Sequence, residues 1–156
     1  MGAHQIRRLS ENLFIKQCIV EGSIVDGVYP SSSTYIDVSG YDRFAFLIAA
    51  GDSDDTAVTA QVVQATAAAG TGSKVVTGAA ITGTSLAGSS SDDRWAMIEV
   101  DNERLDIVND FQYVALDVGA TGGSATELTV FFFGIEPRVK PPTFGTDKAE
   151  IVYVDG

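Results

Sequence analysis

The sequence predicts an all-β protein: one β-sandwich or jelly-roll-like domain with extended N- and C-terminal arms. Three observations lead to this fold class. Short apolar segments, several of them with period-two alternation, are separated by turns rich in Gly, Ser, Thr and Asp. No segment carries a convincing helical period over about 10–15 residues. The 156 residues, 45% of them hydrophobic, suffice for one domain with a core of its own.

Residues 1–33 are expected to hold an N-terminal arm and the first strands. The polar stretch 1–12 has no clear period, which is typical of an arm with at most one helical turn. Leu13–Val20 is apolar enough for a strand, and Ser23–Tyr29 for a second.

The sandwich body is expected over residues 34–136, beginning with the short β-prone segment Thr34–Val38. Two of its segments, Tyr41–Ala50 and Ala125–Gly134, are apolar on both faces, which predicts strands covered on both sides. The alternate positions are Phe44, Phe46 and Ile48 against Ala45, Leu47 and Ala49 in the first, and Leu128, Val130 and Phe132 against Phe131, Phe133 and Ile135 in the second.

The remaining elements follow from alternation and from prolines. Residues 102–110 allow one helical turn, because Leu105 and Val108 are three positions apart. Residues 137–156 are expected to form an extended C-terminal arm, since prolines remove ladder donors, and its segment Ala149–Val154 is again β-prone and suited to a sheet edge. Four more strands are predicted: Thr56–Thr66, Lys74–Ile81, Arg94–Asp101 and Phe111–Val118.

The net charge of −11 lies entirely in residues 31–136, because the charges of residues 1–30 and of residues 137–156 each sum to zero. An acidic body repels phosphate backbones, so we expect no nucleic-acid partner. No apolar run approaches the roughly 20 residues of a membrane span, and no secretory signal is visible. We therefore expect a protein made in a cytoplasm, without a membrane partner.

The residues that catalysis uses are almost missing. The single histidine, His4, lies in the polar N-terminal stretch, and the single cysteine, Cys18, lies in an apolar segment where a small buried hydrophobe is expected. The acid clusters, such as Asp52, Asp54 and Asp55, match no complete calcium loop and read as solvated turns. We expect no enzyme, no catalytic residue, no metal site and no cofactor.

Aromatic and apolar side chains suggest contact surfaces instead. The strands that are apolar on both faces carry more apolar surface than one sandwich core hides, so copies of the chain are expected to pack there. The subunit-interface candidates are Phe44, Phe46, Phe131 and Phe133. A second interpretation takes the aromatics as a sugar-stacking platform, although aromatics in strands more often fill a core or an interface. That platform would consist of Trp95, Tyr29, Tyr35, Tyr41 and Tyr113.

Three segments of the chain resemble small virion proteins of tailed bacteriophages, several of which are head decoration (cement) proteins. The segments are Tyr35–Ile48, Asp117–Gly119 before a Gly/Ser turn, and Thr129–Gly134, and the similarity spans roughly residues 34–140.

The resemblance implies a homotrimer on the outer surface of the mature capsid, where it binds the major capsid protein and stabilises the head. Such proteins clasp neighbouring capsid subunits with extended arms, so the capsid-contact candidates are the basic residues of the arms: Arg7, Arg8, Arg138 and Lys140. Two alternatives stay open, which are another virion component of the tail or adaptor type, and a carbohydrate-binding β-sandwich module.

Overall fold

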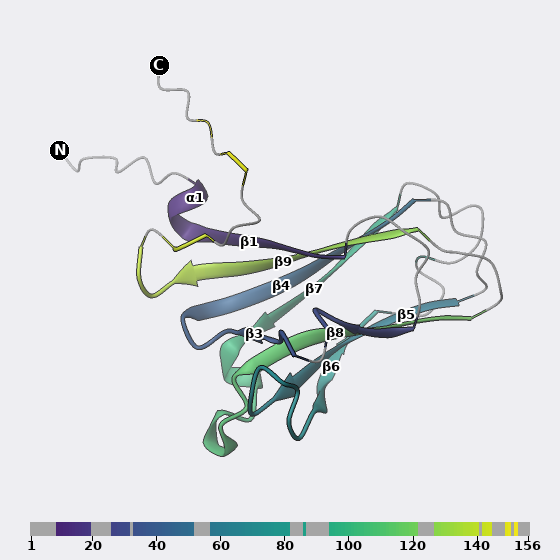
Figure 1. Cartoon of the computed structure of the whole chain (residues 1–156), viewed down its shortest axis with the longest axis horizontal. Helices are drawn as coiled ribbons and strands as arrows, with labels where there is room; N and C mark the ends of the chain where they lie inside the picture. The colour runs from purple at the N-terminus through teal and green to yellow at the C-terminus, as the bar shows by residue number, and fades with distance from the viewer. Residues whose placement is uncertain are drawn as a thin grey trace.

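A computed structural model confirms the all-β sandwich, with two antiparallel sheets packed face to face (Figure 1). It describes residues 9–19, 26–31, 33–51, 57–81, 86, 94–121, 127–140, 142–144, 149–150 and 152. The strands are β1 (Leu13–Ile19), β2 (Gly27–Tyr29), β3 (Ile36–Asp37), β4 (Tyr41–Ala50), β5 (Ala57–Ala65), β6 (Lys74–Ala80), β7 (Trp95–Asp101), β8 (Tyr113–Thr121) and β9 (Leu128–Pro137). The helical turns are α1 (Leu9–Asn12), η2 (Asn102–Arg104) and η3 (Ile107–Asn109).

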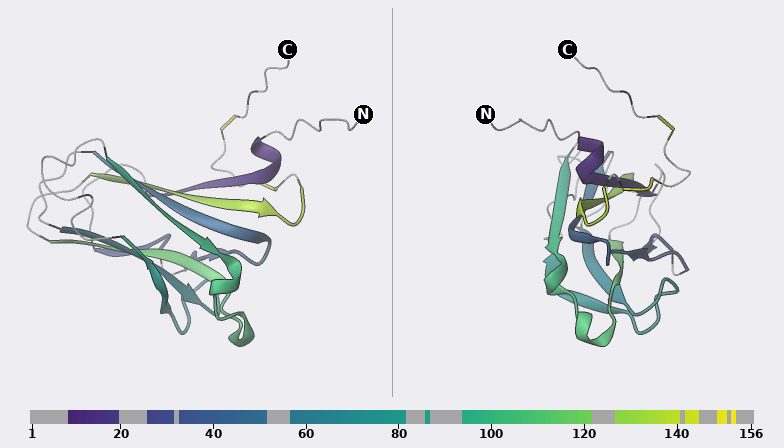
Figure 2. Two further views of the ribbon diagram at one scale, coloured as in Figure 1. Left: turned by 180° about the vertical axis from the view of Figure 1, so that it is seen from behind. Right: turned by 90° about the vertical axis from the view of Figure 1, so that its left-hand side faces the viewer.

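The first sheet has the strand order β1-β9-β4-β7, and the second has the order β2-β8-β5-β6 with β3 also paired to β8. Figure 2 shows the two layers from behind and from one end. Strands from the two halves of the chain pair in mirror order: β1 with β9, β2 with β8, β4 with β7 and β5 with β6, all antiparallel. The first strand of the chain therefore belongs to the sandwich itself, which begins at Leu13.

The core lies between the sheets and follows the predicted alternation. On β4 and β9 the side chains of Phe44, Phe46 and Phe132 are fully buried, and the second sheet contributes Val62 and Leu116 opposite them. Close-packed interiors tolerate little change of volume, so these positions fix the distance between the sheets.

Tyr41 closes one end of this core. Its ring lies 5.8 Å from the ring of Phe14 and 6.3 Å from that of Phe132, measured between centroids. Burial, and to a lesser degree the carboxylate of Asp37, raises the pKa of the Tyr41 hydroxyl above its ordinary value. The C-terminal segment also packs here, because the ring of Phe144 stacks on Phe14 at 5.9 Å. Residues 142–144 thus return to the body instead of leaving it at once.

The region 102–110, where one helical turn was predicted, holds two short 3-10 helices. The buried side chain of Asn102 ties η2 to the turn before β4, since its Nδ2 donates to the carbonyl oxygens of Val38 (3.3 Å) and Tyr41 (3.1 Å). The Val38 carbonyl also accepts from the Tyr41 amide at 3.0 Å, so the Asn102 side chain reinforces the turn that leads into β4.

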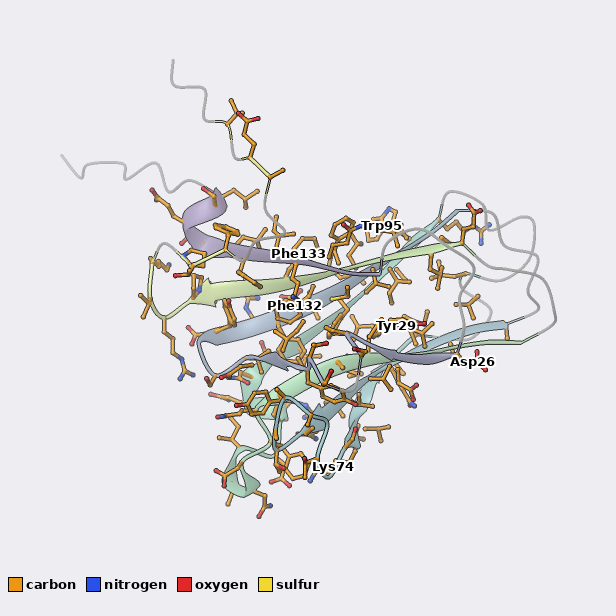
Figure 3. All side chains as sticks on the ribbon, viewed as in Figure 1. Asp26, Tyr29, Lys74, Trp95, Phe132 and Phe133 are labelled. Carbon is orange, nitrogen blue, oxygen red and sulfur yellow. The ribbon has the colours of Figure 1, made fainter. Side chains whose placement is uncertain are left out.

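An ion pair joins β6 to the loop before η3. The Lys74 ammonium contacts the carboxylate of Asp106 and lies 3.8 Å from the centroid of the Phe111 ring (Figure 3 labels Lys74). Asn109 also donates to this carboxylate, at 2.8 and 3.0 Å, and the Asp106 amide donates to the side chain of Gln64 at 2.8 Å. The hydrogen bond from Lys74, followed by that from Asn109, lowers the pKa of Asp106 below its ordinary value.

Gly134→Ala should destabilise the fold. A Cβ at this position would lie 2.5 Å from Cε1 of Tyr41, whose ring is held between Phe14 and Phe132. Overpacking of this kind lowers the free energy of unfolding by about 1–3 kcal/mol, which chemical denaturation measures. Gly40→Ala is the matched control, since a Cβ there meets nothing within 4 Å. Equal stability of both variants and the wild type would contradict the packing described for Tyr41.

Lys74→Met should raise the pKa of Asp106 toward its ordinary value, because the strongest interaction with the carboxylate is lost. A carboxyl group whose pKa is lowered on folding stabilises the fold above the unfolded pKa, and that contribution disappears as the pH falls through the folded value. The stability difference between wild type and variant should therefore be present at neutral pH and shrink in strong acid. Carboxyl NMR titration measures the pKa, and Lys140→Met should leave it unchanged, because Lys140 follows β9 of the first sheet and donates to Asn12.

Candidate interaction surface

The most distinctive surface lies on the side of the first sheet that faces away from the core, here called the outer face. Because Phe14 and Cys18 on β1 and the alternate positions of β9, β4 and β7 pack inward, the strand registers assign the remaining side chains to this face. They are Leu13, Ile15 and Gln17 on β1; Thr129, Phe131, Phe133 and Ile135 on β9; Arg43, Ala45, Leu47 and Ala49 on β4; and Trp95, Met97, Glu99 and Asp101 on β7.

The outer face is apolar over most of its area. Trp95 is 67% exposed, Met97 46% and Ile15 42%, and Phe131 and Phe133 between them are partly exposed. Figure 3 shows Phe133 and Trp95 on this side of the sheet, whereas Phe132 points between the two sheets. Large apolar side chains gathered on one exposed surface are a mark of binding sites.

The charges of the outer face lie at one corner, where Arg43 pairs with two carboxylates. Arg43 forms ion pairs with Glu99 (3.1 Å) and with Glu136 (3.4 Å). A hollow of about 370 Å³ adjoins this corner. It is lined by Asp42, Arg43, Asp101, Asn102, Glu103, Ile107, Glu136 and Arg138.

The hollow does not assemble a reactive centre. Its two arginines are bound to carboxylates, since Arg138 pairs with Asp42 at 3.3 Å in addition to the pairs of Arg43. Exposed pairs of this kind contribute little to stability, because water screens them. Over the ranges that the structure describes, no three His, Cys, Asp or Glu side chains gather as metal ligands would.

Part of the opposite surface, on the second sheet, is covered by Tyr35 of the chain itself, whereas Val75 on the edge strand β6 stays 50% exposed. Tyr35 is only 6% exposed and packs with Val63, Ala65 and Ala115. Its amide donates to the carbonyl of Ala68 at 2.9 Å, and its hydroxyl lies 3.4 Å from the hydroxyl of Ser73. Among the described residues, no side chain covers the outer face of the first sheet as Tyr35 covers part of the second.

The four subunit-interface candidates divide between the two sides of the first sheet. Phe131 and Phe133 lie on the outer face, and they share one side of β9 as the alternation predicted. Phe44 and Phe46 are 0% exposed and belong to the core, where their rings pack against Phe132. A second copy cannot reach them without opening the sandwich, so the contact surface is corrected to the outer side of the sheet.

Of the capsid-contact candidates, Arg138 and Lys140 lie within the described residues. Both are exposed, and both already have partners in the chain: Arg138 pairs with Asp42, and Lys140 donates to Asn12 Oδ1 at 2.7 Å. Arg7 and Arg8 lie outside the described residues.

The aromatic platform proposed for sugar stacking is not assembled around Trp95. Tyr35 and Tyr113 belong to the cluster on the second sheet, and Tyr41 packs on Phe14. Tyr29 packs against the core between the sheets. Trp95 instead shares its surface with Met97, because the two residues lie two positions apart on the edge strand β7 and face the same side.

Three further findings complete the description of the chain. No helix among the described residues has the length and apolar character needed to span a bilayer. Cys18 is partly buried and packs against the core. Comparison with protein-family models, with curated proteins and with solved structures finds no match to this chain.

Proposed function

We propose that this protein is a bacteriophage capsid decoration protein: a non-enzymatic jelly roll, assembled as a homotrimer, that binds the major capsid protein on the outside of the mature head and stabilises it. The observation that carries the proposal is the outer face, because large apolar side chains stay exposed on it, whereas Tyr35 covers the small apolar residues Val63, Ala65 and Ala115 of the second sheet. A surface of this kind serves contact with other macromolecules.

The strand pairing supports the jelly-roll class. With β3 set aside, eight strands form two four-stranded sheets in which the first strand pairs with the last, the second with the second last, and so on inward. This is an antiparallel ribbon wrapped into a sandwich. Jelly rolls occur in viral capsid proteins and in lectins, so the fold is compatible with the virion role by analogy and does not decide it.

The resemblance of Tyr35–Ile48, Asp117–Gly119 and Thr129–Gly134 to phage virion proteins favours the capsid over other partners. The distribution of charge suits the same role, since the net charge of −11 lies in residues 31–136 and leaves both terminal segments neutral overall. The basic residues of those segments would meet the shell while the acidic body faces solvent.

Stabilisation of the head would follow from mass action. A protein that binds the expanded lattice and not its precursor stabilises the expanded state by an amount that grows with concentration, about 1.4 kcal/mol per site for each tenfold excess over Kd. Many copies, each touching more than one capsid subunit, multiply weak contacts.

Two other functions can be distinguished from this one by experiment: one by where the protein lies in the virion, the other by whether it binds glycans. A tail or adaptor component would share the fold, and labelled protein in negative-stain images would then mark the tail or neck instead of the head. A carbohydrate-binding module would use the exposed Trp95, and a glycan array that stays silent removes it.

Purified protein should bind empty, expanded heads of its phage and raise the temperature at which they break open, and it should not bind unexpanded precursors. Co-sedimentation and a thermal release assay measure both effects. Arg138→Ala together with Lys140→Ala should weaken binding, whereas Arg104→Ala, an exposed arginine on η2 outside the terminal segments, should leave it unchanged. The absence of binding to expanded heads would end the proposal.

A further inference from the structure

We propose that the outer face is the surface through which copies of this chain pack against each other, with Trp95, Met97 and Phe133 in the contact. The proposal rests on the proposed function only in treating the protein as one that assembles. It assigns the partner of the outer face as a second copy of the chain, and it leaves the basic terminal segments to the shell.

The size of the apolar surface fits an interface between copies. Taking about 200 Å² for a large side chain, the exposed parts of Trp95, Met97 and Ile15 supply roughly 300 Å². The partly exposed Phe131 and Phe133 add to this area. A standard interface buries about 800 Å² on each partner, of which about 65% is apolar between identical subunits. The outer face therefore approaches the apolar area that such a contact needs.

The charges favour a second copy over a charged partner. Two copies of a chain with a net charge of −11 repel each other over most of their surface. On the outer face, however, the described charges are confined to one corner, where Arg43 already neutralises part of the charge of Glu99 and Glu136. Contact through the apolar part brings no like charges together, and a basic or acidic partner would find no complementary charge there.

Trp95 reports this contact directly, because it is the single tryptophan of the chain. Its indole is largely exposed in one copy. Self-association should therefore shift its fluorescence emission to shorter wavelength as the concentration rises, and dilution should reverse the shift. Light scattering coupled to size exclusion should give a mass that is a multiple of 16.4 kDa at micromolar concentration.

Trp95→Glu and Met97→Glu should weaken self-association at least about 30-fold, the usual size of a hot-spot effect. The control is Val75→Glu, which places the same charge on a 50% exposed valine of β6, at an edge of the second sheet, and should keep the mass of the wild type. Circular dichroism and thermal melts verify that the variants fold, and the dilution experiment on Trp95 needs no variant.

A wild-type mass of 16.4 kDa at micromolar concentration, with emission independent of dilution, overturns this inference. So does a multimer whose mass neither glutamate variant changes. If the wild type is monomeric and still binds expanded heads, the self-association and the trimer fail, whereas the capsid-binding role of the proposed function stands. If copies associate through the outer face and expanded heads are not bound, the self-association stands and the capsid-binding role fails.

Discussion

The packing around Phe132 is the constraint on which the rest of the structure depends. Its ring lies 5.4 Å from Phe46, 6.0 Å from Phe44, 6.2 Å from Phe14 and 6.3 Å from Tyr41, so one side chain of β9 binds together three strands of the first sheet. Burying each such ring contributes about 1.5–3 kcal/mol. Because side chains alternate along a strand, placing Phe132 inward sets its neighbours in sequence on the outer face. The inward orientation of Phe132 on β9 therefore determines both the core and the exposed apolar surface.

The outer sides of the two sheets are covered to different extents, and their charged residues are placed accordingly. A small apolar cluster on the second sheet is covered by Tyr35, whose hydroxyl and amide have partners in the loop between β5 and β6. The first sheet keeps an apolar centre and a charged corner, where Arg43 holds two carboxylates. An acidic chain that concentrates its charge away from one apolar surface keeps a place where the charge repulsion between identical copies is smallest.

Alternation along the sequence was sufficient to predict the strands and which residues share a face, because it depends only on neighbouring positions. It did not predict which face of β4 points inward, since Ala45 and Leu47 are apolar as well. Volume decides this, because only the rings of Phe44 and Phe46 fill the space between the sheets. The mirror pairing of distant strands and the position of Tyr35 over the second sheet depend on contacts far apart in sequence, for which no local pattern exists.

The same long-range pairing explains why the outer face needs charges at its border. Strand β1 finds its partner β9 only when the two ends of the chain meet, and sheets rich in such contacts form slowly. An apolar sheet with exposed edges is prone to pair with other chains during that time. Glu99 and Asp101 on the edge strand β7 counter this, because a strand added there must leave them solvated or provide a basic partner. An exposed apolar centre with charged residues at its border therefore suits a surface that assembles in an ordered way rather than one that aggregates.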